Sequence, residues 1–187
     1  MGMYTSIRGV VKVKPEYVIM AEKFANHWKD NNQEELEEEY SFVKEYFKTA
    51  RSTWIPSANE LQRPFEDEQE YFKQRVDNDV FYFSADLKDY YDNATKLSPI
   101  DSFLKNILEV IAEEIYLLET NYEEYSSVSQ YGFSDDIINT IEVANVANKE
   151  IEEGYWGWGS SNEEEEESEE SDIFKEYKLR NNLRVFR

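Results

Sequence analysis

The chain lacks cysteine entirely and has a single histidine, His27, among its 187 residues. Disulfide bonds, thiolate nucleophiles and cysteine-ligated zinc or iron–sulfur sites are therefore excluded. One histidine cannot form a histidine-rich metal site. Only six glycines are present, and none belongs to a glycine-rich phosphate loop, since three fall within residues 154–159 and the others are scattered. We therefore expect no metal and no cofactor.

Long apolar runs are missing as well. No stretch approaches the ~20 apolar residues that a membrane-spanning helix requires. The first residues lack the charged start and the apolar run of a signal peptide. We therefore expect a cytoplasmic protein without membrane contact.

Basic residues are few for the number of acidic ones. The chain has 20 Lys or Arg against 41 Asp or Glu, which gives a formal net charge of −21 and a pI of about 4.4. Such a charge repels phosphates and disfavours direct binding to nucleic acid or to an anionic membrane. Hydrophobic residues nevertheless make up 40% of the chain, including 14 Tyr, 11 Phe and 4 Trp. This apolar content is enough for a core and argues against a fully disordered chain.

Alternation of apolar and polar residues predicts strands over residues 4–14 and 80–88. A further strand is expected over residues 115–125. The short segment 52–57 is a candidate to pair with the first strand, and Pro56 places it at an edge or at its own end. Residues 63–77 are polar, and we expect a loop with some helix there.

Apolar spacing at helical periods predicts three helices. The first begins at Pro15, which lacks the N–H that a first helical turn leaves unpaired. The second runs over residues 34–51, with acidic residues at its N-terminal end and basic residues at the other, an order that complements the helix dipole. The third begins at Ser98 as N-cap, followed by Pro99. Its buried stripe is formed by Ile100, Leu104, Ile107 and Ile111.

The resulting order of strand, helix, strand, strand, helix, strand is that of a split βαβ unit. The expected fold class is α+β, a ferredoxin-like antiparallel sheet with helices on one face. On residues 4–14, 80–88 and 98–125, the chain resembles small ferredoxin-like proteins of unknown role from Gram-positive bacteria and their phages. The resemblance implies a fold and no activity.

The sequence divides the whole chain into three parts. We expect an α+β domain over residues 1–153, with its core in 1–125. Residues 134–151 fit a helix that begins after Ser134, but residues 140–146 fit a strand equally well. Residues 154–172 read as an aromatic–glycine and acidic low-complexity linker, which we expect to be disordered, and residues 173–187 as a basic-aromatic segment.

Few residues of the chain suggest catalysis. His27 is expected to be a helix-terminal or exposed structural histidine. Asp86 and Lys88 form a D-x-K at a strand end, which resembles half of the PD-(D/E)xK nuclease signature. Its upstream aspartate would be Asp77 or Asp67, neither of which has the usual sequence setting, and a strongly negative nuclease would repel its substrate. We therefore expect a protein that is not an enzyme.

Acidity is the strongest signal in the sequence. Removing the seven glutamates of residues 163–170 still leaves a net charge of −14, so the excess is also in the folded part. The composition is similar to that of phage DNA-mimic inhibitors of host defence or transcription. This is a resemblance in type of protein and not in sequence. This implies a basic, nucleic-acid-binding protein as partner. The alternative is a ferredoxin-like interaction or regulatory module whose acidity serves solubility only.

Two groups of residues are candidates for contact with a partner. The densest acidic group on a predicted helix comprises Glu34, Glu35, Glu37, Glu38 and Glu39. The second group, Tyr155, Trp156 and Trp158, lies between glycines and forms either an exposed docking tip or an anchor that folds back on the core. The sequence leaves the oligomeric state open.

Overall fold

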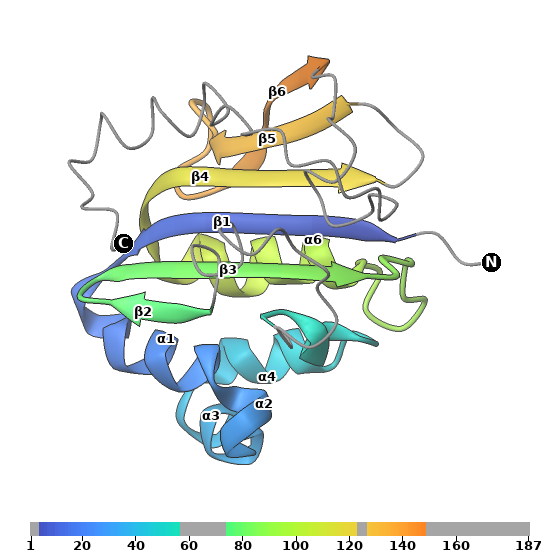
Figure 1. The fold of residues 1–187 in the computed structure, drawn as a ribbon. Coiled ribbons are helices and arrows are strands. Elements are labelled where there is room, and N and C mark those ends of the chain that lie inside the picture. The colour runs from blue at the N-terminus through green and yellow to red at the C-terminus, as the bar shows by residue number, and fades with distance from the viewer. Residues whose placement is uncertain (1–3, 57–73, 123–126, 149–187) are drawn as a thin grey trace, which may run out of the picture.

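The computed structural model describes residues 4–56, 74–122 and 127–148, which form a mixed α+β fold (Figure 1). Six strands make one antiparallel sheet in the order β2-β3-β1-β4-β5-β6. The strands are β1 (Thr5–Val13), β2 (Arg75–Asp77), β3 (Val80–Leu87), β4 (Ala112–Tyr122), β5 (Ser127–Phe133) and β6 (Ile141–Asn148). The predicted strands over residues 4–14, 80–88 and 115–125 are confirmed, with the last one beginning three residues earlier at Ala112.

The helices and the apolar side of the sheet share one core. The helical segments are η1 (Pro15–Tyr17), α1 (Val18–Ala25), α2 (His27–Asp30), α3 (Gln33–Glu39), α4 (Ser41–Phe47), η2 (Ser52–Trp54), α6 (Pro99–Phe103), η3 (Leu104–Leu108) and α7 (Glu109–Ile111). Phe103 of α6 is central, because its ring centroid lies 5.0 Å from that of Phe83 on β3 and 6.2 Å from that of Phe24 on α1. Within the described ranges no helix has the length and apolar character needed to cross a membrane.

The predicted start of the third helix is confirmed in detail. The Ser98 hydroxyl accepts a hydrogen bond from the backbone N–H of Asp101 at 3.1 Å, as an N-cap does. Asp89 adds a second support, because its carboxylate accepts from the N–H of Ile100 at 2.9 Å. The helix then passes from α6 into a π-helical turn, η3, before α7, and its predicted stripe of apolar side chains is buried.

The prediction of one continuous helix over residues 34–51 is wrong. The segment is divided at Tyr40, whose backbone is extended with φ −128° and ψ 106°, so α3 and α4 are separate helices. On one straight helix, residues two positions apart point to opposite sides. The division instead brings the rings of Tyr40 and Phe42 to 5.8 Å, and Phe42 packs edge-on against Tyr17 at 5.7 Å. The break thus coincides with aromatic packing of Phe42 against both Tyr40 and Tyr17.

The strand suggested at residues 52–57 is wrong as well, because Ser52–Trp54 forms a 3₁₀ turn. The buried hydroxyl of Tyr46 lies 2.5 Å from the carbonyl oxygen of Ser52 and 2.6 Å from that of Ile55. These two contacts draw the backbone into a turn and away from the sheet. The second strand of the sheet is instead β2, within the segment that the sequence predicted to be a loop with some helix.

Of the two interpretations of the region after Gly132, the strand is confirmed and the helix is wrong. Residues 134–140 form the β5–β6 connection, in which the N–H of Ser134 donates to the carbonyl of Thr140 at 2.7 Å. Ile137, which the helix interpretation placed on its apolar face, is 59% exposed in this connection. The segments predicted as linker, 154–172, and as basic C-terminus, 173–187, lie outside the described residues.

Candidate functional site

The five glutamates singled out from the sequence occupy one short helix, α3, and are called here the α3 acidic patch (Glu34, Glu35, Glu37, Glu38 and Glu39). Leu36 is the one apolar residue of α3, and it is fully buried. A single anchor directed inward leaves the remaining positions facing outward. Four glutamates of the patch are exposed, and Glu37 is partly exposed.

Lys23 of α1 holds one side of this patch. Its ammonium Nζ lies 2.6 Å from Oε1 of Glu35 and 3.0 Å from Oε2 of Glu39, which are four residues apart and therefore on one side of α3. Hydrogen bonds to these carboxylates raise the pKa of Lys23. The hydrogen bond from Lys23 likewise lowers the pKa of Glu39, so this carboxylate is ionised at neutral pH. Because these side chains are solvent-exposed, the pairs orient the helix more than they stabilise the fold.

The rest of the patch carries uncompensated charge. Glu34 and Glu38 make no ion pair or hydrogen bond with any residue that the structure describes, and Glu37 accepts only from the amide of Gln33 at 2.7 Å. The expected match to the helix dipole holds for Glu34 and Glu35 in the first turn only. Because the helix ends at Glu39, the last three glutamates lie at its negative end. Among the described side chains, Lys23 is thus the one cation paired with this patch, and it contacts two of the five carboxylates.

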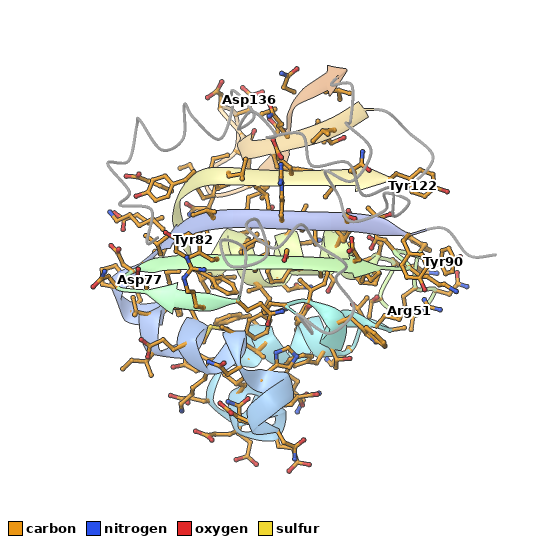
Figure 2. All side chains as sticks on the ribbon, in the orientation of Figure 1. Arg51, Asp77, Tyr82, Tyr90, Tyr122 and Asp136 are labelled. Atoms are coloured by element: carbon orange, nitrogen blue, oxygen red, sulfur yellow. The ribbon has the colours of Figure 1, made fainter. Side chains whose placement is uncertain are left out.

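Acidity extends over the whole described fold. Residues 4–56, 74–122 and 127–148 contain 22 Asp or Glu and 12 Lys or Arg, a difference of −10. Figure 2 shows Asp77 at one end of β2 and Asp136 in the β5–β6 connection, so acidic side chains occur far apart on the molecule. The negative field thus belongs to the folded domain as well as to the rest of the chain.

A buried ion pair on the sheet was not predicted from the sequence. Arg8 of β1 lies directly opposite Glu119 of β4, and its Nη2 is 3.0 Å from Oε2 of Glu119. The amide of Gln130 on β5 donates to the other carboxylate oxygen at 2.9 Å. Both charged side chains are buried. The strand alternation assigned Arg8 to the side opposite the apolar residues, but the register that pairs it with Glu119 could not be deduced from one sequence.

The D-x-K pair does not assemble a nuclease centre with the described aspartate. The Asp86 carboxylate accepts a hydrogen bond from the Ser6 hydroxyl, and the Lys88 ammonium lies 5.5 Å from the centre of the Tyr4 ring. Asp77 pairs with Val80 at the opposite end of β3, and Asp67 lies outside the described residues. No group of three or more potential metal-binding side chains occurs in the described part of the chain.

The same Asp86 gives a test of the buried polar side of the sheet. Burial raises the pKa of Asp86 from 3.8 to about 6, with a smaller opposing effect of the Ser6 hydroxyl. The folded state therefore binds this proton more tightly than the unfolded state. The stabilisation that protonated Asp86 gives to the folded state is complete below about pH 4 and is lost as the pH rises through 6. The rise from 3.8 to about 6 is about two pKa units, and one unit corresponds to about 1.4 kcal/mol. We therefore expect the free energy of unfolding of Asp86→Asn to rise by about 3 kcal/mol relative to that of wild type as the pH goes from 4 to 7.5.

Urea unfolding of both proteins at several pH values measures this difference. Asp77→Asn is the matched control, since Asp77 is exposed, and its free energy of unfolding should run parallel to that of wild type. Parallel curves for Asp86→Asn would contradict the assignment of a raised pKa to Asp86.

His27 is a structural residue. It begins α2, as the prediction of a helix-terminal position required, but it is buried and not exposed. Its ring stacks on Phe24 at 5.3 Å, and its two nitrogens lie 2.8 Å from the carbonyl oxygen of Phe24 and 3.1 Å from that of Thr53. Burial lowers its pKa. These contacts join α1 and α2 to the η2 turn.

The aromatic candidates Tyr155, Trp156 and Trp158 lie outside the described residues. Comparison with protein-family models, with curated proteins and with solved structures gives no match to this chain.

Proposed function

We propose that this protein is a non-enzymatic acidic inhibitor, encoded by a phage or another mobile element, which occupies the basic nucleic-acid-binding surface of a host protein. The observation that carries the proposal is the α3 acidic patch, in which four carboxylates are exposed and a fifth is partly exposed. Among the described residues, Lys23 pairs with two of the five. A surface helix that served only solubility would be expected to carry charges of both signs.

The proposed mechanism is electrostatic substitution. Carboxylates fixed on a folded surface take the place of phosphates in the partner's basic groove. Leu36 anchors α3 to the core, and the contacts of Lys23 with Glu35 and Glu39 fix its orientation. This fixed surface reduces the conformational entropy lost on binding. Association is fast at low salt and weakens as salt screens the charges.

We also propose that β1 to β4 and their helices form a ferredoxin-like split βαβ unit. The strand order β2-β3-β1-β4 supports this proposal, together with the helices that connect β1 to β2 and β3 to β4. The β5–β6 hairpin is then an extension beside β4. In this proposal the inhibitor uses the fold as a scaffold, and the function belongs to the surface.

The experiment is a five-fold Glu→Gln variant of the α3 acidic patch. The captured partner is first identified from the native host, and its affinity is then measured by calorimetry at low and moderate salt. We expect the variant to lose at least about tenfold in affinity, because each lost carboxylate leaves a basic group of the partner unpaired. Wild-type binding should be competed by double-stranded DNA or by RNA and should weaken steeply with salt.

A charge-matched variant is the control. It neutralises five acidic residues away from α3, namely Glu16, Glu113, Glu114, Asp135 and Asp136, all of which are exposed. This control should retain most of the affinity, and so should a deletion of residues 160–171. Equal losses in both five-fold variants would show that net charge matters and the α3 contact does not. If no basic protein is captured at any salt, the alternative of an interaction module with solubilising acidity replaces the proposal.

A further inference from the structure

In the described part of the sheet, β6 is an edge strand, and its composition is unusual for this acidic chain. Among the described residues it pairs with β5 on one side only. All its side chains from Glu142 to Val146 are exposed, with Val143 49% and Val146 57% exposed. Glu142 is its one charged residue, and the strand contains no Lys, Pro or Gly. Of the features that commonly protect an edge strand from pairing, β6 lacks Lys and Pro and has one charged residue and one bulge.

A bulge gives the two sides of β6 opposite characters. Val143 pairs with Tyr131 and Val146 with Ser129, and the register shifts between Gln130 and Tyr131. The shift places both valines on one face of the sheet although they are three residues apart. Glu142 and Asn145 pair with Gly132 and Gln130 and therefore lie on the other face, where Gln130 contacts the Glu119 carboxylate. Over residues 142–146, one face of the edge thus carries the two valines, and the other carries Glu142 and Asn145.

The C-terminal sequence has the complementary pattern. Residues 173–187 contain five Lys or Arg and one Glu, whereas residues 149–172 contain eleven Asp or Glu and one Lys. Within residues 173–187, apolar and basic side chains alternate over Tyr177, Lys178, Leu179 and Arg180. A strand of this pattern presents an apolar face and a basic face.

We propose that the chain's own C-terminal segment, residues 173–187, binds the open edge of β6 as an added strand. Its apolar side chains extend the face of Val143 and Val146, and its basic side chains extend the face of Glu142. The 28 residues between Asn148 and Tyr177 span about 30 Å as a flexible chain, which is enough to return to a strand about 27 Å long. A second copy of the protein is a poorer occupant, because two chains of charge −21 repel each other.

This contact goes beyond the function proposed above and does not depend on it. Strand addition uses the main-chain groups of the edge, and the alternating side chains select the occupant. The chain would in this way cover its own exposed edge and keep its basic segment away from its acidic partner-binding surface.

Disulfide trapping in the full-length chain tests the proposal, and the absence of native cysteine makes each introduced pair unambiguous. One cysteine is placed on β6, as Asn145→Cys on the polar face or Val146→Cys on the apolar face. The second scans residues 177–180. We expect Asn145→Cys to favour positions 178 and 180, and Val146→Cys to favour positions 177 and 179, by at least about fivefold, because disulfide geometry requires neighbouring side chains on one face.

Glu38→Cys on α3 combined with the same four positions is the control. A tail held only by general electrostatic attraction would cross-link there as well and without alternation, which would overturn the proposal. Disulfide-linked dimers would overturn it too, since they place the contact between chains. As a measurement without cysteine, Leu179→Asp combined with Val185→Asp should accelerate amide exchange in β6 by about tenfold while β1 is unchanged. Unchanged exchange in β6 would contradict the added strand.

Discussion

Ile107→Asp is expected to unfold the protein at room temperature. Ile107 lies in the π-helical turn η3, is fully buried and belongs to the core that joins the helices to the sheet. A carboxylate at this position would lose its hydration without gaining a partner, at a cost of more than about 4 kcal/mol. Because a domain is stable by about 5–15 kcal/mol, a loss of this size removes much or all of its stability. Leu104→Asp, one turn earlier on the same buried side, should behave alike.

Lys105→Asp provides the control, because Lys105 lies in the same helical turn and is exposed. It introduces the same side chain, and its free energy of unfolding should change by no more than about 0.5 kcal/mol. Circular dichroism melts of the three variants and wild type measure the effect. A cooperative melt of Ile107→Asp near the wild-type temperature would mean that this helix does not pack on the sheet as described.

The sequence predicts those elements whose local pattern and tertiary environment agree. Residues 80–88 alternate cleanly, and β3 buries the predicted side chains of Phe81 and Phe83. Ser98 and Pro99 predict a helix start because an N-cap needs only neighbouring backbone groups, and the observed cap to Asp101 is of this local kind. Each of these signals is contained within a few residues, so tertiary contacts need only preserve it.

The errors occur where distant contacts decide the backbone. Tyr40 continues the helical spacing from Leu36 to Val43, yet the helix is divided there, where the ring of Phe42 packs against Tyr17. At the turn Ser52–Trp54, the hydroxyl of Tyr46 lies within hydrogen-bond distance of the carbonyl oxygens of Ser52, its first residue, and of Ile55, which follows it. β2 is three residues long, too short for a periodic signal, and is defined by its pairing with β3. None of these contacts has a signature within the segment concerned.

The candidate site was predictable in identity and not in geometry. A run of glutamates around one leucine predicts an outward-facing acidic helix, and α3 has this form. The position of Lys23 between Glu35 and Glu39 depends on how α1 packs beside α3, which the sequence does not specify. The pairing of Arg8 with Glu119 depends in the same way on strand register. The local sequence thus predicts which charges a surface carries, and the tertiary fold determines which of them are paired.

Gly9→Ala is expected to be the most damaging small substitution in the sheet. Gly9 pairs with Phe83, and a methyl group on its α-carbon would lie 2.2 Å from Cζ of the Phe83 ring, far inside van der Waals contact. The ring has little room to move, because Phe81 and Phe103 both lie 5.0 Å away between ring centroids. Forcing extra volume into such a packed core costs about 1–3 kcal/mol and sometimes more.

A double-mutant cycle with Phe83→Leu separates this clash from other effects of alanine. Phe83→Leu alone should destabilise the fold by leaving space beside Phe103, and the added methyl group of Gly9→Ala should fill part of that space. We therefore expect the double variant to be more stable than the sum of the two single changes predicts, with a coupling of about 1–2 kcal/mol. Gly132→Ala is the control, because its methyl group would lie 3.5 Å from Cβ of Ala144, an ordinary contact. Denaturant unfolding of the four proteins decides: additive losses would show that the Phe83 ring does not cover Gly9.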